Sequence, residues 1–97
     1  MVTYISLARF TDHGIRMVKE TTKRADLVKE MASKFGVKVT GIYWTHGAYD
    51  LVTICEANDD ASFAAFNLYI GASGNVRLEP MKAYNREEMA QILSRLP

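Results

Sequence analysis

The chain has 97 residues, and 12 basic side chains against 11 acidic ones give it a formal net charge of +1. This length predicts one domain over residues 1–97, and a hydrophobic share of 48% is typical of a folded globular protein rather than a disordered one. The balanced charge argues against nucleic-acid binding, and the single cysteine, Cys55, excludes an internal disulfide and a cysteine-rich zinc site.

The first third of the chain predicts a strand followed by helical structure. Apolar residues in the segment 2–9 suit a pleated strand. Thr11 or Asp12 is suited to cap a helix, and apolar residues recur at helical spacing between 15 and 35. Gly36 stands where a left-handed residue often ends a helix, so we expect the helix to end there.

The middle of the chain predicts a hairpin and a second helix. Strands are expected at about 37–45 and 49–56, and Gly47 between them tolerates the positive φ that a tight turn needs. Asn58 or Asp59 is suited to cap the helix that follows, which we expect to run to about residue 70. Because no residue from 61 to 70 is charged, we expect this helix to be buried on most of its circumference, with Phe63, Phe66 and Tyr69 as candidates to contact another subunit or the terminal helix.

The end of the chain predicts a fourth strand and a terminal helix. Pro80 removes a backbone donor from the strand at 75–84, so this strand should lie at an edge of the sheet or contain a bulge. Asn85 followed by Glu88 is typical of a helix start with a capping box. The terminal helix has one apolar stripe, made of Met89, Ile92, Leu93 and Leu96.

The order of these elements is βαββαβ plus a C-terminal helix, which predicts an α+β, ferredoxin-like sandwich. Its helices cover one face of an antiparallel sheet. The strands carry large apolar groups at both parities, as at Tyr4, Ile5 and Leu7, whereas a sheet with one wet face alternates more cleanly. We therefore expect the second face to be covered by another copy of the chain, in a homodimer or a higher homo-oligomer.

The segment from Tyr43 to Asp60 resembles the signature of the GYD domain family, whose name refers to the residues that are here Gly47, Tyr49 and Asp50. Shorter segments after the first strand, before the main helix and in the last strand are similar to the family too, so the resemblance covers nearly the whole chain. The resemblance implies the dimeric α/β-barrel arrangement, in which two ferredoxin-like sheets close face to face. That superfamily includes cofactor-independent monooxygenases, haem proteins and ligand-sensing domains, so it implies a fold and no defined activity.

The hairpin carries the candidate catalytic residues Asp50, Tyr49 and His46. In a functional interpretation, Asp50 or His46 acts as a base and Tyr49 orients a substrate in a pocket. In a structural interpretation, Gly47 makes the turn, Asp50 accepts hydrogen bonds from backbone N–H groups, and Tyr49 packs at an interface. The structural interpretation is the more economical one, because Asp and Gly have local reasons to occur in a turn.

The remaining candidates are ligand-binding residues that could line a cavity or pack at a subunit contact. They are Tyr4, Trp44, Thr45, Gly47, Arg24 and His13. The two histidines lack the clustered spacing of metal ligands, so no metal and no cofactor are expected. Cys55 lies in an apolar strand, which favours a small buried hydrophobic residue over a nucleophile.

Three functions are consistent with these patterns. The first is a small soluble, oligomeric protein that binds a small-molecule ligand or acts as an accessory protein. The alternative is a cofactor-independent oxygenase or isomerase for a small aromatic or quinone-like compound, and the third is a sensor module without its own DNA-binding element. The N-terminus has no signal-peptide pattern and no apolar stretch is long enough to span a membrane, so we expect a cytoplasmic protein without a membrane partner.

Overall fold

The computed structural model describes residues 1–97, and the chain forms four strands, four α-helices and one short 3-10 helix, η1. In chain order these are β1 (Val2–Phe10), α1 (Asp12–Arg16), η1 (Val18–Glu20), α2 (Thr21–Lys34), β2 (Val37–Trp44), β3 (Leu51–Ala57), α3 (Asp60–Ala72), β4 (Val76–Ala83) and α4 (Arg86–Leu93). No helix is long and apolar enough to cross a membrane.

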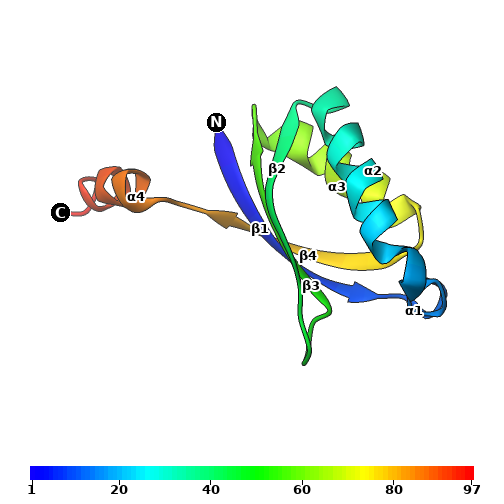
Figure 1. Cartoon of the computed structure of the whole chain (residues 1–97). Coiled ribbons are helices and arrows are strands. Elements are labelled where there is room, and N and C mark those ends of the chain that lie inside the picture. The colour runs from blue at the N-terminus through cyan, green and yellow to red at the C-terminus, as the bar shows by residue number, and fades with distance from the viewer.

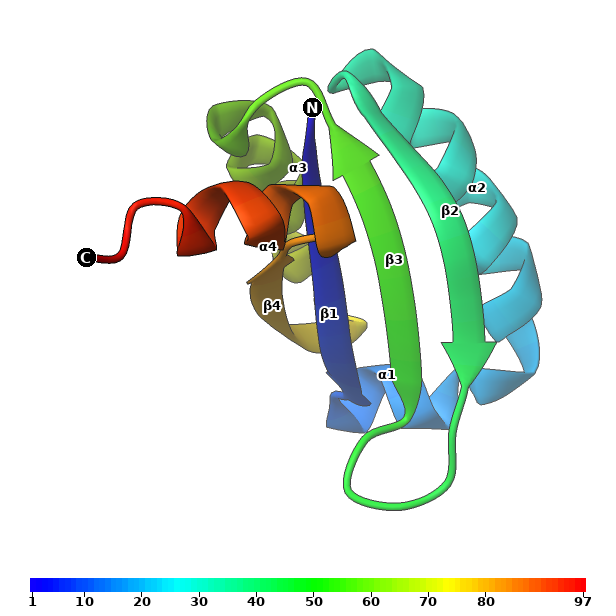
Figure 2. The ribbon, with the colours of Figure 1, turned by 90° about the vertical axis from the view of Figure 1, so that its left-hand side faces the viewer.

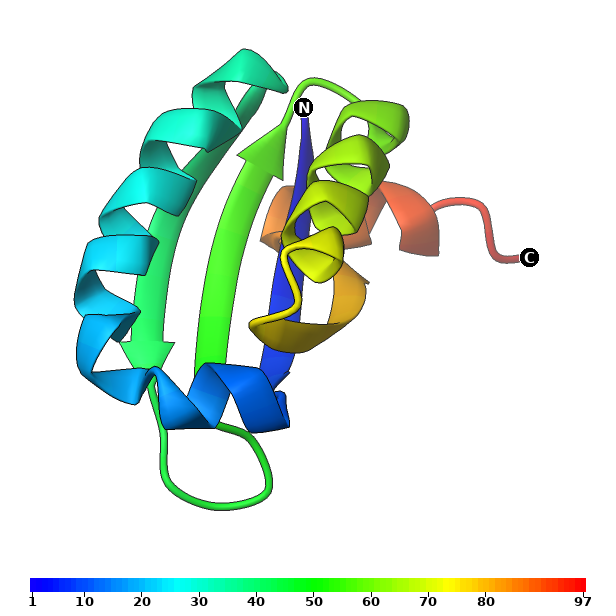
Figure 3. The same cartoon turned by 90° about the vertical axis from the view of Figure 1, so that its right-hand side faces the viewer.

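The four strands form one antiparallel sheet in the order β2-β3-β1-β4, which confirms the expected ferredoxin-like arrangement. Pro80 lies in β4, which pairs only with β1, so it is in an edge strand as predicted. Helices α2 and α3 lie side by side on one face of the sheet (Figures 1 and 3). Helix α4 projects beyond the opposite face, away from both (Figures 1 and 2).

Local signals in the sequence fix the starts of three helices. The side-chain oxygen of Thr11 accepts a hydrogen bond from the Gly14 amide, and Asp59 accepts one from Ser62. Asn85 begins α4 with a complete capping box. These caps satisfy amide groups that a helix start leaves unpaired, which is why the predicted boundaries are close to the observed ones.

The hydrophobic core lies between the sheet and the two covering helices. Its fully buried members are Ala32, Val37, Cys55, Ala57, Phe63 and Phe66. Tyr4 stacks on Phe63 with ring centroids 4.0 Å apart, and so fixes α3 over β1. Of the α3 residues expected to be covered, Phe63 and Phe66 are buried, whereas Tyr69 is 44% exposed and its neighbour Leu68 is 71% exposed. The expected contact of α3 with the terminal helix is wrong, because α4 lies on the other side of the sheet (Figure 1).

The opposite face of the sheet carries a second set of apolar side chains. Helices α2 and α3 lie on the other face, and α4 projects away from the sheet (Figure 1). Successive side chains of a strand point to opposite faces of the sheet. Because Ser6 and Ala8 point to the core, Ile5 and Leu7 point to this opposite face. We call this set the open-face patch, and it consists of Ile5, Leu7, Tyr43, Val52, Ile54 and Met81. Tyr43 is 61% exposed and Met81 is 47% exposed.

Candidate functional site

The hairpin between β2 and β3 holds most of the predicted site residues in a loop over residues 45–50. Strand β3 begins at Leu51 rather than at Tyr49 as expected. The loop is closed because the Thr45 amide donates to the Asp50 carbonyl over 2.8 Å, and the Thr45 hydroxyl donates to the Tyr49 carbonyl over 2.6 Å. Gly47 adopts a φ of 145° at its tip, a conformation that favours glycine.

Asp50 joins this loop to the end of β1. Its carboxylate oxygen Oδ2 accepts a hydrogen bond from the Phe10 amide over 2.9 Å, and its own amide donates to the Ala8 carbonyl over 2.8 Å. The side chain is half-buried. Asp50 therefore continues the pairing of β1 with β3 for one step beyond the strand, which agrees with the structural interpretation of this residue.

Tyr49 belongs to a polar cluster at the same end of the sheet. The guanidinium carbon of Arg9 lies 4.4 Å from the centre of the Tyr49 ring, and Arg9 also donates to the Ala48 carbonyl over 2.9 Å. Glu79 lies 3.9 Å from the Arg9 guanidinium, and its carboxylate raises the pKa of the Tyr49 phenol. Sequence reasoning missed Arg9 and Glu79, because β4 reaches this cluster only through its pairing with β1.

The two histidines belong to different segments at one end of the sheet. His46 is exposed in the loop, and His13 is exposed in α1, which lies at the same end of the sheet (Figure 3). No group of three or more His, Cys, Asp or Glu side chains is arranged to hold a metal ion. Trp44, the last residue of β2, is bound to α2 instead: its indole Nε1 donates to the Thr21 hydroxyl at the start of α2 over 3.1 Å.

Tyr4 lies at the opposite end of the sheet from the hairpin. It lies six positions before Phe10 in β1, which corresponds to roughly 20 Å of strand. Its hydroxyl donates to Asp60 over 2.9 Å, and Lys82 pairs with the other oxygen of that carboxylate over 3.0 Å. The hydrogen bond from Lys82 lowers the pKa of Asp60 the most, and the hydrogen bond from Tyr4 lowers it further. Tyr4 therefore helps to fix the start of α3 and does not join the predicted constellation.

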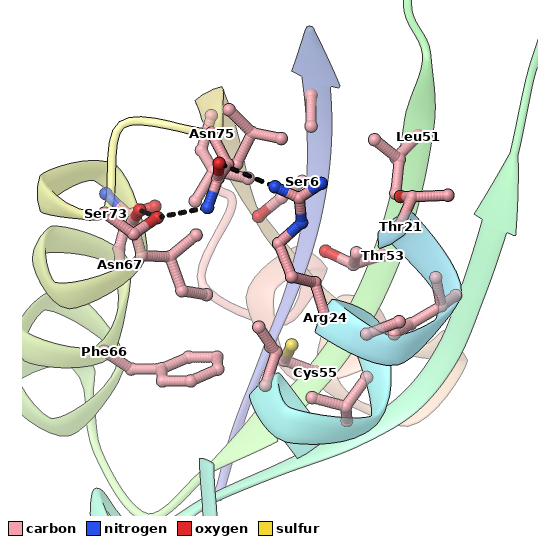
Figure 4. Close-up of a pocket in the computed structure, with 18 of the residues that line it drawn as sticks. Ser6, Thr21, Arg24, Leu51, Thr53, Cys55, Phe66, Asn67, Ser73 and Asn75 are labelled. Carbon is pink, nitrogen blue, oxygen red and sulfur yellow. Dashed lines mark hydrogen bonds between the residues drawn. The ribbon is translucent and has the colours of Figure 1, made fainter. Parts of the chain in front are cut away.

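A cavity of about 110 Å³ lies between the sheet and the helices α2 and α3 (Figure 4). Its apolar walls include Val28, Val39, Phe66 and Ile70. Ser6, Thr53 and Cys55 line its floor on the sheet, where Ser6 and Thr53 are directly paired across β1 and β3. Asp50, Tyr49 and His46 do not line it.

Arg24 spans the edge of this cavity and is its only charged lining residue. Its Nη1 donates to the Asn75 side chain over 2.8 Å, and its Nη2 donates to the Met17 carbonyl. The bond to Asn75 connects α2 to the segment before β4 (Figure 4), and the bond to Met17 connects α2 to the residue between α1 and η1. The structure thus places Arg24 at a different site from the hairpin residues with which the sequence analysis grouped it.

Cys55 on the cavity floor is protonated at neutral pH. Burial raises the pKa of its thiol to about 11, since an apolar environment disfavours the thiolate. A neutral, buried thiol is a poor nucleophile, which agrees with the prediction that Cys55 is a small packing residue.

Comparison with known proteins gives a consistent result. The family model described as GYD domain matches residues 4–93. A protein of Thermus thermophilus named "Glutamine synthetase and cystathionine beta-lyase binding protein" is 32% identical over 97 residues, which cover 99% of each chain. The crystal structure of TTHA0845 from Thermus thermophilus superposes with a TM-score of 0.55 at 21% identity, and covers 88% of this chain and 95% of that one. This structural likeness supports the fold alone.

Proposed function

Because this chain belongs to the GYD domain family, we propose that it is a small accessory protein that acts by binding another protein. The Thermus relative of almost equal length is named for binding two enzymes, which supports a binding role. We propose a glutamine synthetase or a cystathionine beta-lyase as the partner of this chain. No catalytic residue is needed for this function, and the roles predicted for Asp50, Tyr49 and His46 in an oxygenase or isomerase stay predictions.

The observation that carries this proposal is the apolar surface that the fold leaves uncovered. The apolar stripe on and just after α4, which the sequence analysis predicted, belongs to a helix that projects from the domain (Figure 1). Its side chains Met89, Ile92, Leu93 and Leu96 are 44%, 37%, 51% and 66% exposed. A contiguous apolar surface of this kind is typical of a protein-binding site, so we propose α4 as the element that contacts the enzyme.

We further propose that two copies of the chain associate through the open-face patch. The patch forms two rows across the sheet: Tyr43, Val52 and Leu7 are neighbours in one row, and Ile54, Ile5 and Met81 in the other. The charged cluster around Arg9 and Glu79 lies at the margin of this patch. An apolar centre with a polar margin is the usual anatomy of a stable protein interface.

Self-association can be tested by light scattering on two matched variants. Tyr43→Arg places a charge in the open-face patch, and Leu68→Arg places one on the outer side of α3. Both side chains are widely exposed in the single chain, so both variants should fold. We expect the wild type and Leu68→Arg to be dimers or larger at micromolar concentration and Tyr43→Arg to be a monomer. A monomeric wild type, or a Tyr43→Arg variant that stays associated, would contradict this interface.

Enzyme binding can be tested by surface plasmon resonance with glutamine synthetase and cystathionine beta-lyase from the same organism as the chain. We expect at least one of them to bind, and Leu93→Arg in α4 to weaken binding roughly tenfold or more, because a charge replaces an apolar contact. Leu68→Arg serves as the control and should bind like the wild type. Failure of both enzymes to bind would contradict the proposed partner, and unchanged binding by Leu93→Arg would exclude α4 as the contact.

A further inference from the structure

We propose that the cavity between the sheet and the helices α2 and α3 binds a small monocarboxylic acid with an apolar body, and that Arg24 pairs with its carboxylate. This site lies inside one chain and is separate from both the open-face patch and α4. The inference therefore goes beyond the proposed binding of a partner protein, and it stands or falls independently of it.

The first argument is the unbalanced charge of Arg24. The three ion pairs of the structure join Arg9 to Glu79, Lys23 to Glu20 and Lys82 to Asp60, and Arg24 is in none of them. No Asp or Glu lines the cavity either. Arg24 is half-buried, and a cation at such a place is stabilised when an anion joins it.

The second argument is the set of donors that Arg24 still offers. A guanidinium has five N–H groups in a planar fork that matches a carboxylate. Two of them are used, toward the Asn75 side-chain oxygen and the Met17 carbonyl, and both acceptors are neutral. The bond to Asn75 (Figure 4) and the bond to Met17 hold the guanidinium at the edge of the cavity, so a carboxylate would meet a cation that is already oriented.

The third argument is the character of the interior behind Arg24. The walls are apolar, through residues such as Val28, Phe66 and Ile70. The floor is uncharged, because Cys55 is protonated and Ser6, which is only 2% exposed, contributes a neutral hydroxyl. No charged group inside would pair with a second carboxylate, which selects a monocarboxylate over a dicarboxylate. Asn67 also lines the cavity and adds one neutral amide, whose buried Oδ1 atom has no hydrogen-bond partner.

The volume sets the size of the acid. An enclosed apolar cavity of about 150 Å³ accommodates benzene. The cavity of about 110 Å³ therefore suits a body of roughly four or five carbon atoms, with the carboxylate outside it at Arg24. A short branched acid such as isovalerate meets both conditions, whereas acetate has too small a body to fill the cavity.

The experiment is a titration of the full ¹⁵N-labelled chain, followed by two-dimensional NMR. The probes are isovalerate, its uncharged amide isovaleramide, and acetate. We expect isovalerate to saturate in the low-millimolar range, with shifts at the Arg24 Nε–H signal and at the amides of Ser6 and Thr53. The amide and acetate should each bind at least about tenfold more weakly, because one lacks the charge and the other the apolar body.

Three variants complete the test. Arg24→Gln should weaken isovalerate binding about tenfold or more, while Arg16→Gln, which removes an exposed charge away from the cavity, should leave it unchanged. Ala25→Leu fills part of the cavity, keeps Arg24 and should also abolish binding. The proposal is overturned if isovalerate does not bind the wild type, if isovaleramide binds as tightly, or if Ala25→Leu binds normally. The comparison of acid and amide uses the wild type, so it decides even if Arg24→Gln fails to fold.

Discussion

Replacing Asp50 tests whether the central residue of the predicted site holds the fold together. Asp50→Ala removes the acceptor of the Phe10 amide, which is half-buried at the end of β1. An unpaired buried donor costs about 1–3 kcal/mol, and partial access to water places this one at about 1–2 kcal/mol. For a domain of this size such a loss lowers the melting temperature by roughly 5–15 °C.

Asp50→Asn separates the structural role from a chemical one. The amide keeps one acceptor oxygen and the shape of the side chain, so we expect it to lose less than half as much stability as Asp50→Ala. Asp26 is an exposed residue of α2 with no hydrogen bond or ion pair, so Asp26→Ala should stay within about 0.5 kcal/mol of the wild type. Thermal unfolding followed by circular dichroism measures all three. Equal and negligible losses for both Asp50 variants would refute the structural role and favour a functional carboxylate.

Three further predictions concern stability and reactivity. Gly14→Ala should destabilise the protein strongly, because the new Cβ would lie 1.9 Å from the Asn75 carbonyl oxygen. In Gly71→Ala the new Cβ meets nothing within 4 Å, so this variant should stabilise α3. Thermal unfolding of the two variants measures both effects. Cys55, whose pKa is raised to about 11, should resist iodoacetamide at pH 8 until the protein unfolds, as mass spectrometry would reveal. The pKa of the Asp60 carboxyl is lowered in the folded protein, so its contribution to stability is present above the unfolded pKa near 4 and is lost as the pH falls through the folded pKa. Asp60→Asn removes this carboxyl, so the free energy of unfolding should fall less steeply as the pH is lowered below about 4.

The sequence predicted those parts of the fold that depend on local chemistry. The caps at Thr11, Asp59 and Asn85 occur where the pattern placed them, because a cap is decided by residues within one helical turn. The edge position of β4 followed from Pro80 for the same reason. The start of β3 was misplaced by two residues, since the bonds between Thr45 and residues 49 and 50 hold the chain in a loop there.

The candidate site was less predictable because tertiary pairing decides it. Tyr4 was grouped with the hairpin on residue type, but it lies at the other end of β1. The strand direction could have revealed this. Because β1 and β3 are antiparallel, the start of β1 pairs with the end of β3, whereas the hairpin precedes the start of β3. The pairing of Arg9 with Glu79 and the position of Arg24 over a cavity depend on side-chain geometry that periodicity does not encode.

The central position of β1 has a consequence for how the chain folds. Both neighbours of β1 in the sheet, β3 and β4, come from the second half of the chain, and only β2 and β3 are joined by a short loop. Closing long loops is slow because it costs chain entropy before any contact is gained. We therefore expect the β2–β3 hairpin to form early and β1 to enter the sheet late, so that Asp50, which ties the hairpin to the end of β1, acts mainly on the rate of unfolding.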